Sequence, residues 1–289
     1  MTRPAQLLII DPQNDFCDLP EAACPVAPAS GARLAPALPV AGAHADMQRL
    51  ARLIRLGGAG LAEITVTLDS HHRLDIAHPT FWQRADGSPV APFTPITAAE
   101  VRRGEYRPRD PAARPRALAY LDELEARGRY TLMIWPVHCE IGSWGHNVHA
   151  ELRAAYNQWE EQQLRVVQKV SKGENPWTEH YSALLAEVPD AEDPHTQLNL
   201  GLIERLADAE WILIGGEASS HCVRATTEHL VANLPGGGAQ RITLLTDCMS
   251  PVAGFVPQHE AFLAEMQQRG VQLATSLEVL PQLQASTGQ

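Results

Sequence analysis

The chain has 289 residues, and 23 lysines and arginines against 34 aspartates and glutamates give it a formal net charge of −11 at pH 7. This acidity excludes nucleic acid as the expected partner, because binding to phosphates needs a basic surface. No apolar run approaches the roughly 20 residues of a membrane span, and the first residues show no signal-peptide pattern. We therefore expect a globular, cytoplasmic protein with no membrane partner.

Short apolar runs alternate with helical patterns along the chain. The runs predict strands at Leu7–Ile10, Ile64–Leu68, Thr131–Trp135, Arg165–Val170, Trp211–Ile214 and Ile242–Thr246, with a less pronounced run at Val271–Ala274. Helices are predicted at Ala45–Leu56, Asn147–Gln162, Leu198–Ala207, Ser220–Ala232 and Pro257–Arg269. Because the runs lack polar alternation, we expect strands that are buried on both faces of a parallel sheet. The pattern predicts a doubly wound α/β fold, with a mostly parallel sheet of about six strands and helices on both faces.

Two Pro-rich segments are too long to be simple connections. They span about residues 17–43 and 79–116, and long loops inside a compact domain are usually lids, interface arms or insertions. No stretch resembles a linker between independent cores. We expect one domain over residues 1–289, carrying these two insertions and a polar C-terminal tail from Gln282.

Polar residues follow the predicted strands at the point where each strand ends. They are Asp11 after the first, Asp69 and His71 after the second, His138 after the third, Lys172 after the fourth and Cys222 after the fifth. Ligands of parallel α/β sheets bind beyond the carboxyl ends of the strands. We therefore expect these side chains to form one site.

Cys222 is the candidate nucleophile among five cysteines. None of the five is in a CxxC pair, so reduced thiols are expected. Cys222 lies where a strand passes through a tight turn into a helix, and the N-terminus of a helix stabilises a thiolate. The free N–H groups at that end can also hold an oxyanion. A buried core thiol is the alternative, but Asp11 and Lys172 nearby favour a nucleophile.

Four segments together resemble the isochorismatase-like cysteine hydrolase superfamily, and most closely its nicotinamidase branch. They are residues 8–17 (LIIDPQNDFC), residues 135–139 (WPVHC), residues 171–173 (SKG) followed by Tyr181-Ser182, and residues 216–224 (GEASSHCVR). Each is weak alone, but their order and their places at strand ends are specific. The resemblance extends from residue 6 to about residue 255.

The resemblance implies a catalytic triad of Asp11, Lys172 and Cys222. Cys222 would attack a carboxamide and form a thioester, and Asp11 would move the proton to the leaving ammonia. The backbone N–H groups of Ala218 and Cys222 would hold the oxyanion, after a cis peptide at Glu217–Ala218. Lys169 is a second candidate for the lysine, but Lys172 has the family's following glycine.

The resemblance also implies a divalent metal bound by Asp69, His71, His78 and His138. Zn²⁺ is the expected ion, with Fe²⁺ or Mn²⁺ as alternatives, and its role would be to hold the pyridine nitrogen of the substrate. The spacing before His78 departs from the family pattern by about one residue. His72 is therefore an alternative ligand.

Phe16, Trp135 and Tyr181 match the positions of the family's aromatic clamp around the ring. The expected activity is conversion of nicotinamide to nicotinate and ammonia, with a role in NAD salvage, and the chain is expected to form a homo-oligomer. The excess length, and Ser220 where many members carry aspartate, leave another small carboxamide open as substrate. A catalytically silent fold is opposed by the intact triad. An isochorismate-type hydrolase is opposed by the presence of both a metal set and a cysteine.

Overall fold

The computed structural model describes residues 5–285 and is built around a single six-stranded sheet. The sheet order is β10-β9-β8-β1-β2-β7, and every neighbouring pair is parallel. The strands are β1 (Ala5–Ile10), β2 (Leu61–Asp69), β7 (Gln168–Lys172), β8 (Trp211–Gly216), β9 (Ile242–Leu245) and β10 (Gln272–Ala274). The expected α/β fold with a parallel sheet is confirmed.

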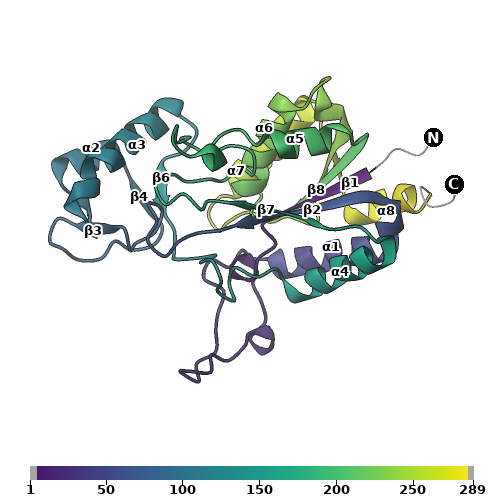
Figure 1. The fold of residues 1–289 in the computed structure, drawn as a ribbon, viewed down its shortest axis with the longest axis horizontal. Coiled ribbons are helices and arrows are strands. Elements are labelled where there is room, and N and C mark those ends of the chain that lie inside the picture. Colours follow the sequence, from purple (N-terminus) through teal and green to yellow (C-terminus); the bar gives the residue numbers. More distant parts are fainter. Residues whose placement is uncertain (1–4, 286–289) are drawn as a thin grey trace.

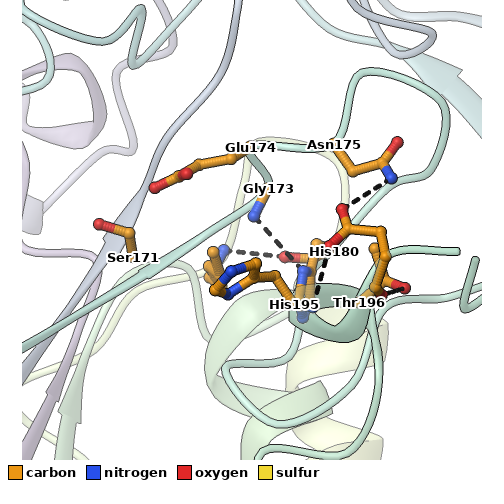
Figure 2. A pocket seen from close by; sticks show the side chains of 9 residues that line it. Ser171, Gly173, Glu174, Asn175, His180, His195 and Thr196 are labelled. Atoms are coloured by element: carbon orange, nitrogen blue, oxygen red, sulfur yellow. Dashed lines mark hydrogen bonds between the residues drawn. The ribbon is translucent and has the colours of Figure 1, made fainter.

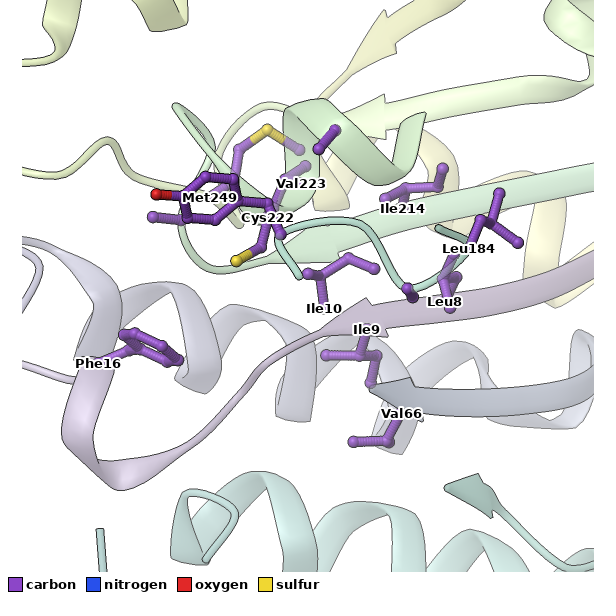
Figure 3. Close-up of a cluster of buried hydrophobic side chains, with 14 of the residues drawn as sticks. Leu8, Ile9, Ile10, Phe16, Val66, Leu184, Ile214, Cys222, Val223 and Met249 are labelled. Carbon is purple, nitrogen blue, oxygen red and sulfur yellow. The ribbon is translucent and has the colours of Figure 1, made fainter. Parts of the chain in front are cut away.

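The two central strands are the most apolar part of the molecule. Every residue of β1 and of β8 is buried, as expected for strands covered on both faces. Figure 3 shows Ile10 of β1 and Ile214 of β8 in the same buried cluster as Cys222. The rigid centre of the sheet therefore extends directly to the candidate nucleophile.

Helices cover both faces of the sheet (Figure 1). One face carries α1 (Ala43–Gly57), α4 (Ala150–Gln163) and α8 (Ser276–Ala285), and the other carries α5 (Leu200–Ala207), α6 (Cys222–Asn233) and α7 (Val256–Gln268). None of the helices between residues 5 and 285 is long and apolar enough to cross a membrane.

The predicted strand at Thr131–Trp135 does not belong to the central sheet. It forms β6 (Leu132–Ile134), which pairs antiparallel with β4 (Thr94–Ile96). Its apolar residues are buried against the second insertion, so their composition could not distinguish this environment from the main sheet. The less pronounced run at the C-terminus, β10, supplies the sixth strand instead.

The predicted strand at Arg165–Val170 is displaced toward the C-terminus. β7 begins at Gln168 and ends at Lys172, so the lysine is the last residue of the strand. As an edge strand it keeps alternate side chains exposed, Lys169 among them.

The second Pro-rich segment is a folded lobe. It contains β3 (Trp82–Arg84) paired with β5 (Tyr106–Pro108), and α2 (Ala98–Arg103), and it runs into α3 (Arg114–Arg127). The lobe extends from one end of the sheet (left in Figure 1). Thr97 and Glu100 form a reciprocal capping box at the start of α2, which explains why a helix forms in so Pro-rich a segment. The first segment, by contrast, contains a short 3-10 turn at Glu21–Ala23 and two isolated bridges, Cys17 with Val40 and Val26 with Arg33, before α1 begins.

The expectation of a polar tail from Gln282 is wrong for residues 282–285. These residues are the last turn of α8, and Leu283 is fully buried. A Cβ on Gly57 would lie 3.1 Å from Leu283 Cδ1, so a glycine permits the close packing of α8 on α1. Residues 286–289 lie outside the described residues.

Candidate active site

Four adjacent strands bring the predicted triad and one predicted metal ligand to one edge of the sheet. Asp11 directly follows β1, Asp69 and Lys172 end β2 and β7, and Cys222 begins α6 after β8. All four side chains are buried. Strand order alone thus gathers residues that lie up to 211 positions apart in the sequence.

Lys172 is the centre of this cluster. Its Nζ lies 2.9 Å from Asp11 Oδ2, 2.8 Å from Asp69 Oδ1 and 3.6 Å from Cys222 Sγ. A fourth contact, of 3.0 Å, goes to the carbonyl oxygen of His180. One buried ammonium therefore faces two carboxylates and the thiol. Lys169 is exposed, so of the two lysines the structure places only Lys172 in the cluster.

A threonine that the sequence analysis missed holds Asp11 in place. The Thr67 hydroxyl donates to Asp11 Oδ1 and accepts from the Asp11 backbone N–H, at 3.0 Å for the latter. No distinct signal marked it, because Thr67 is one of two threonines, with Thr65, in the run that ends at Asp69. Asp11 itself has a φ of 42°, an unusual value for a residue other than glycine.

Burial decides the protonation of the cluster. It raises the pKa of the Cys222 thiol well above its usual value, although the positive charge of Lys172 opposes this. Burial also raises the pKa of Asp11, again against Lys172. For Lys172 burial acts in the opposite direction, but Asp11 and Asp69 outweigh it and raise its pKa. The resting site therefore holds a neutral thiol beside a carboxyl group able to take its proton.

The turn before Cys222 has a backbone that few residues could adopt. Gly216 has a φ of 120°, and a Cβ there would collide with the carbonyl oxygen of Ile10. The Glu217–Ala218 peptide bond is cis. The backbone N–H groups of Ala218 and Cys222 have no hydrogen-bond partner within residues 5–285. Both donors are thus available for an oxyanion.

Three of the predicted metal ligands form a compact group of histidines. One ring nitrogen each of His71, His78 and His138 lies within 4.8 Å of the others, and all three side chains are buried. Asp69 Oδ2 lies 3.1 Å from His71 Nε2 and 3.3 Å from His138 Nε2. The carboxylate of Asp69 therefore contacts Lys172 with one oxygen and the histidines with the other.

The donors of this group fit a divalent metal ion. His78 Nδ1 is buried without a hydrogen-bond partner among the described residues. Burial, followed by the charge of His138, lowers the pKa of His78 to about 3, so its imidazole is neutral and able to bind a metal near pH 7. Imidazoles with one carboxylate suit Zn²⁺, Fe²⁺ or Mn²⁺. His72 is exposed and takes no part in the group.

Asp75 is a second residue that the sequence analysis missed. Its Oδ2 lies 3.1 Å from His71 Nδ1, and its Oδ1 accepts from the Ala77 N–H at 2.9 Å. A carboxylate behind a ligating histidine fixes the ring and leaves the other nitrogen for the metal. The His71-x-x-x-Asp75 spacing was visible, but nothing in it distinguished this aspartate from a loop residue.

An aromatic wall closes a cavity beside Cys222. All three predicted clamp residues, Phe16, Trp135 and Tyr181, line it. Trp135 Nε1 donates to the Tyr181 hydroxyl at 3.1 Å. The wall also includes two residues that were not predicted, Glu179 and His221. The free space is about 20 Å³, room for about one water molecule.

A larger cavity, of about 230 Å³, is lined by Lys172 and by Gly173 and His180, the last two of which Figure 2 shows. Its walls include the ring of His180, whose Nδ1 accepts from the Gly173 N–H at 3.4 Å. Cys222 does not line it. Lys172 itself lines this second space, and the carbonyl oxygen of His180, another lining residue, contacts Lys172 Nζ.

Comparison with known proteins shows likeness in structure only. No family model matches the sequence, and no curated protein matches it. A nicotinamidase/pyrazinamidase from Acinetobacter baumannii superposes with a TM-score of 0.60 at 19% identity, covering 96% of this chain and 98% of that one. The yeast nicotinamidase bound to the inhibitor nicotinaldehyde superposes with a TM-score of 0.60 at 18% identity, covering 94% of this chain and 99% of that one.

A pyrazinamidase from Pyrococcus horikoshii in complex with zinc gives a TM-score of 0.52 at 20% identity, covering 94% of this chain and 98% of that one. Identities this low bear on the fold and not on the activity. They agree with the resemblance noted in the four sequence segments. The chain has the fold of the nicotinamidases and pyrazinamidases.

Proposed function

We propose that this protein hydrolyses nicotinamide to nicotinate and ammonia through a thioester on Cys222. The observation that carries the proposal is the position of Lys172 Nζ, which contacts Asp11, Asp69 and Cys222 in one buried cluster. A thiol, a proton acceptor and a cation in contact are the groups that amide cleavage by a cysteine requires.

The first half of the reaction starts from the neutral thiol. Asp11 takes the proton as the sulfur attacks the amide carbon, and Lys172 stabilises the negative charge on both groups. The N–H groups of Ala218 and Cys222 donate to the oxyanion. When the C–N bond breaks, Asp11 returns the proton to nitrogen and ammonia leaves, with the acyl group on the sulfur.

The second half releases the acid. Asp11, now ionised again, takes a proton from a water molecule that attacks the thioester. The same two N–H groups hold the second oxyanion. The C–S bond breaks, the thiolate regains its proton from Asp11, and nicotinate leaves.

Asp69, His71, His78 and His138 are the residues that would hold a divalent metal. The metal, when bound, supplies a Lewis-acid contact for a ring nitrogen. These residues orient the ring by fixing that contact, while Phe16 and Trp135 provide its apolar walls. Substrate orientation and bond cleavage are then performed by different groups of the site.

A second candidate substrate is a carboxamide that carries a further hydrogen-bond donor. Glu179 lines the cavity with its Oε2 buried and without a partner among the described residues. A buried acceptor without a partner is costly, so a ligand that donates to it would be favoured over one that does not. Nicotinamide offers such a donor only through its own amide.

Ammonia release measured across nicotinamide, pyrazinamide and aliphatic amides tests the proposal. We expect the aromatic amides to be cleaved and Cys222→Ala to abolish that cleavage. Preference for an aliphatic amide that carries a further hydrogen-bond donor would transfer the proposal to the second candidate. Substantial activity of Cys222→Ala would remove the thioester route. Assembly into a homo-oligomer stays a prediction, which sedimentation of the same protein would check.

A further inference from the structure

Behind the nucleophile turn lies a buried pair of carboxyl groups that the proposed mechanism does not use. Glu217, the residue before Ala218, is 0% exposed, and Asp46 of α1 is 3% exposed. Both carboxyl groups accept a hydrogen bond from Ser250, which brings them together behind the turn. Since both are acceptors when ionised, a bond between them requires a proton.

Ser250, in the loop after β9, ties the pair to the turn. Its backbone N–H donates to Glu217 Oε2 at 3.1 Å, and its hydroxyl donates to Asp46 Oδ2 at 2.6 Å. The Ser219 N–H in turn donates to the Ser250 carbonyl at 2.9 Å. No donor of the described residues faces Glu217 Oε1. Glu217 Oε1 is therefore left without a hydrogen bond, so it can carry or accept a proton.

The charges around the pair do not allow both carboxyl groups to ionise. The groups that face it from the packed elements are Cys17, Asp18, Arg49 and Cys248. Arg49 is the one cation that the described residues bring, and it contacts Asp46 at 2.8 Å from a half-exposed position. Burial first, and then the charge of Asp46, raises the pKa of Glu217 well above its usual value. Like-charged carboxylates in contact and out of water keep one proton.

We propose that Glu217 and Asp46 share one proton and act as a positioning pair, which holds the Glu217–Ala218 turn and the oxyanion donors that follow it. The inference rests on the proposed function only in assigning the Ala218 and Cys222 N–H groups to an oxyanion. If the proton leaves, two negative charges are in contact directly behind the turn. The repulsion would then displace the donors without any change in the triad itself.

The pH dependence of unfolding tests the shared proton without any substrate. A glutamate with a raised pKa keeps its proton in the folded protein and loses it on unfolding above its ordinary pKa of 4.5. Stability therefore falls as pH rises through this window. The Glu217→Gln side chain has nearly the same size as glutamate, and its amide can donate a hydrogen bond to Asp46. It does not titrate, however, so it has no proton to lose on unfolding. From about pH 5 upward, we expect the unfolding constant of the wild type to rise about tenfold more per pH unit than that of Glu217→Gln.

Glu161→Gln is the matched control, because it makes the same exchange on an exposed position of α4. It should keep the slope of the wild type. Equal slopes for the wild type and Glu217→Gln would overturn the shared proton. If no amide is cleaved but the slopes differ by one proton, the proposed function fails and the shared proton stands.

Activity on whichever amide is cleaved tests the positioning role. Glu217→Ala leaves Asp46 without its partner and should lower kcat by about tenfold or more, with a smaller change in KM. Glu217→Gln should recover most of this loss, because the amide restores the hydrogen bond. A folded Glu217→Gln as inactive as Glu217→Ala would overturn positioning, since the carboxyl would then act in the chemistry directly.

Discussion

The two halves of the site differ in how completely the protein satisfies them. In the half formed by Asp11, Lys172 and Cys222, the lysine ammonium lies 2.9 Å from the Asp11 carboxylate and 3.6 Å from the thiol. It also lies 2.8 Å from Asp69. In the half formed by the histidines, three imidazoles crowd together and His78 Nδ1 has no partner. The side chains of the first half are thus paired with one another, whereas the histidines of the second half keep ring nitrogens available to bind a ligand. The difference suggests separate tasks, bond cleavage in one and binding in the other, with Asp69 joining them.

The largest effect should come from removing the sulfur. Cys222→Ala is expected to lower kcat by about 10⁴-fold or more, because the remaining groups of a nucleophilic site act only together. It should leave the metal content unchanged if the two halves are separate. Loss of the metal in this variant would show that the halves depend on each other. Ammonia release and elemental analysis of one preparation measure both effects.

Lys172→Met should have the next largest effect, because it removes the cation that both halves share. We expect kcat to fall by about 10²- to 10³-fold. The unpaired carboxylates left behind should cost about 3 to 5 kcal/mol in the free energy of unfolding. Lys169→Met on the same strand is exposed and serves as the control, measured by urea unfolding. An equal loss in both variants would contradict the assignment of Lys172.

Removing a histidine should affect the binding half selectively. His78→Ala is expected to lose the metal and to raise KM for an aromatic amide more than it lowers kcat, since orientation is lost and the thiol remains. His72→Ala, at an exposed position six residues earlier, should keep both. A fall in kcat alone after His78→Ala would argue that the metal takes part in the cleavage step.

The smallest effect is expected from Asp75→Asn. This carboxylate orients His71 from behind, and the loss of such a contact usually weakens metal binding by about 10- to 100-fold. Competition with a chelator would measure the change. Asp86→Asn, at an exposed loop position, is the control and should not alter the metal affinity.

The residues at strand ends were predictable because sheet order carries them to one edge. Asp11, Asp69 and Cys222 come after largely buried apolar strands. Lys172 instead ends the half-exposed edge strand β7, whose predicted bounds lay too far toward the N-terminus. The supporting residues Thr67, Asp75 and Glu179 were not predictable, because their roles depend on contacts with side chains distant in the sequence. A polar residue in a strand or loop gives no indication of which partner it will meet.

The errors in the fold have a similar cause. Composition identified β6 as a buried strand but could not show that its partner is β4 in the lobe. It also could not show that α8 packs its last turn against α1, because residues 282–285 are polar except for Leu283 and Ala285. The local sequence pattern predicts that a segment forms a helix or a strand. Which element it packs against is decided by contacts with residues distant in the sequence.

The pairing of β6 with β4 has a consequence for how the site can change. Trp135, in the ring wall, directly follows β6, and its ring meets Phe93 of the lobe edge to face at 5.9 Å between centroids. The triad, by contrast, lies on the central sheet. Under the proposed function, we therefore expect substitutions in residues 79–116 to change which amide is preferred more than they change the rate of cleavage.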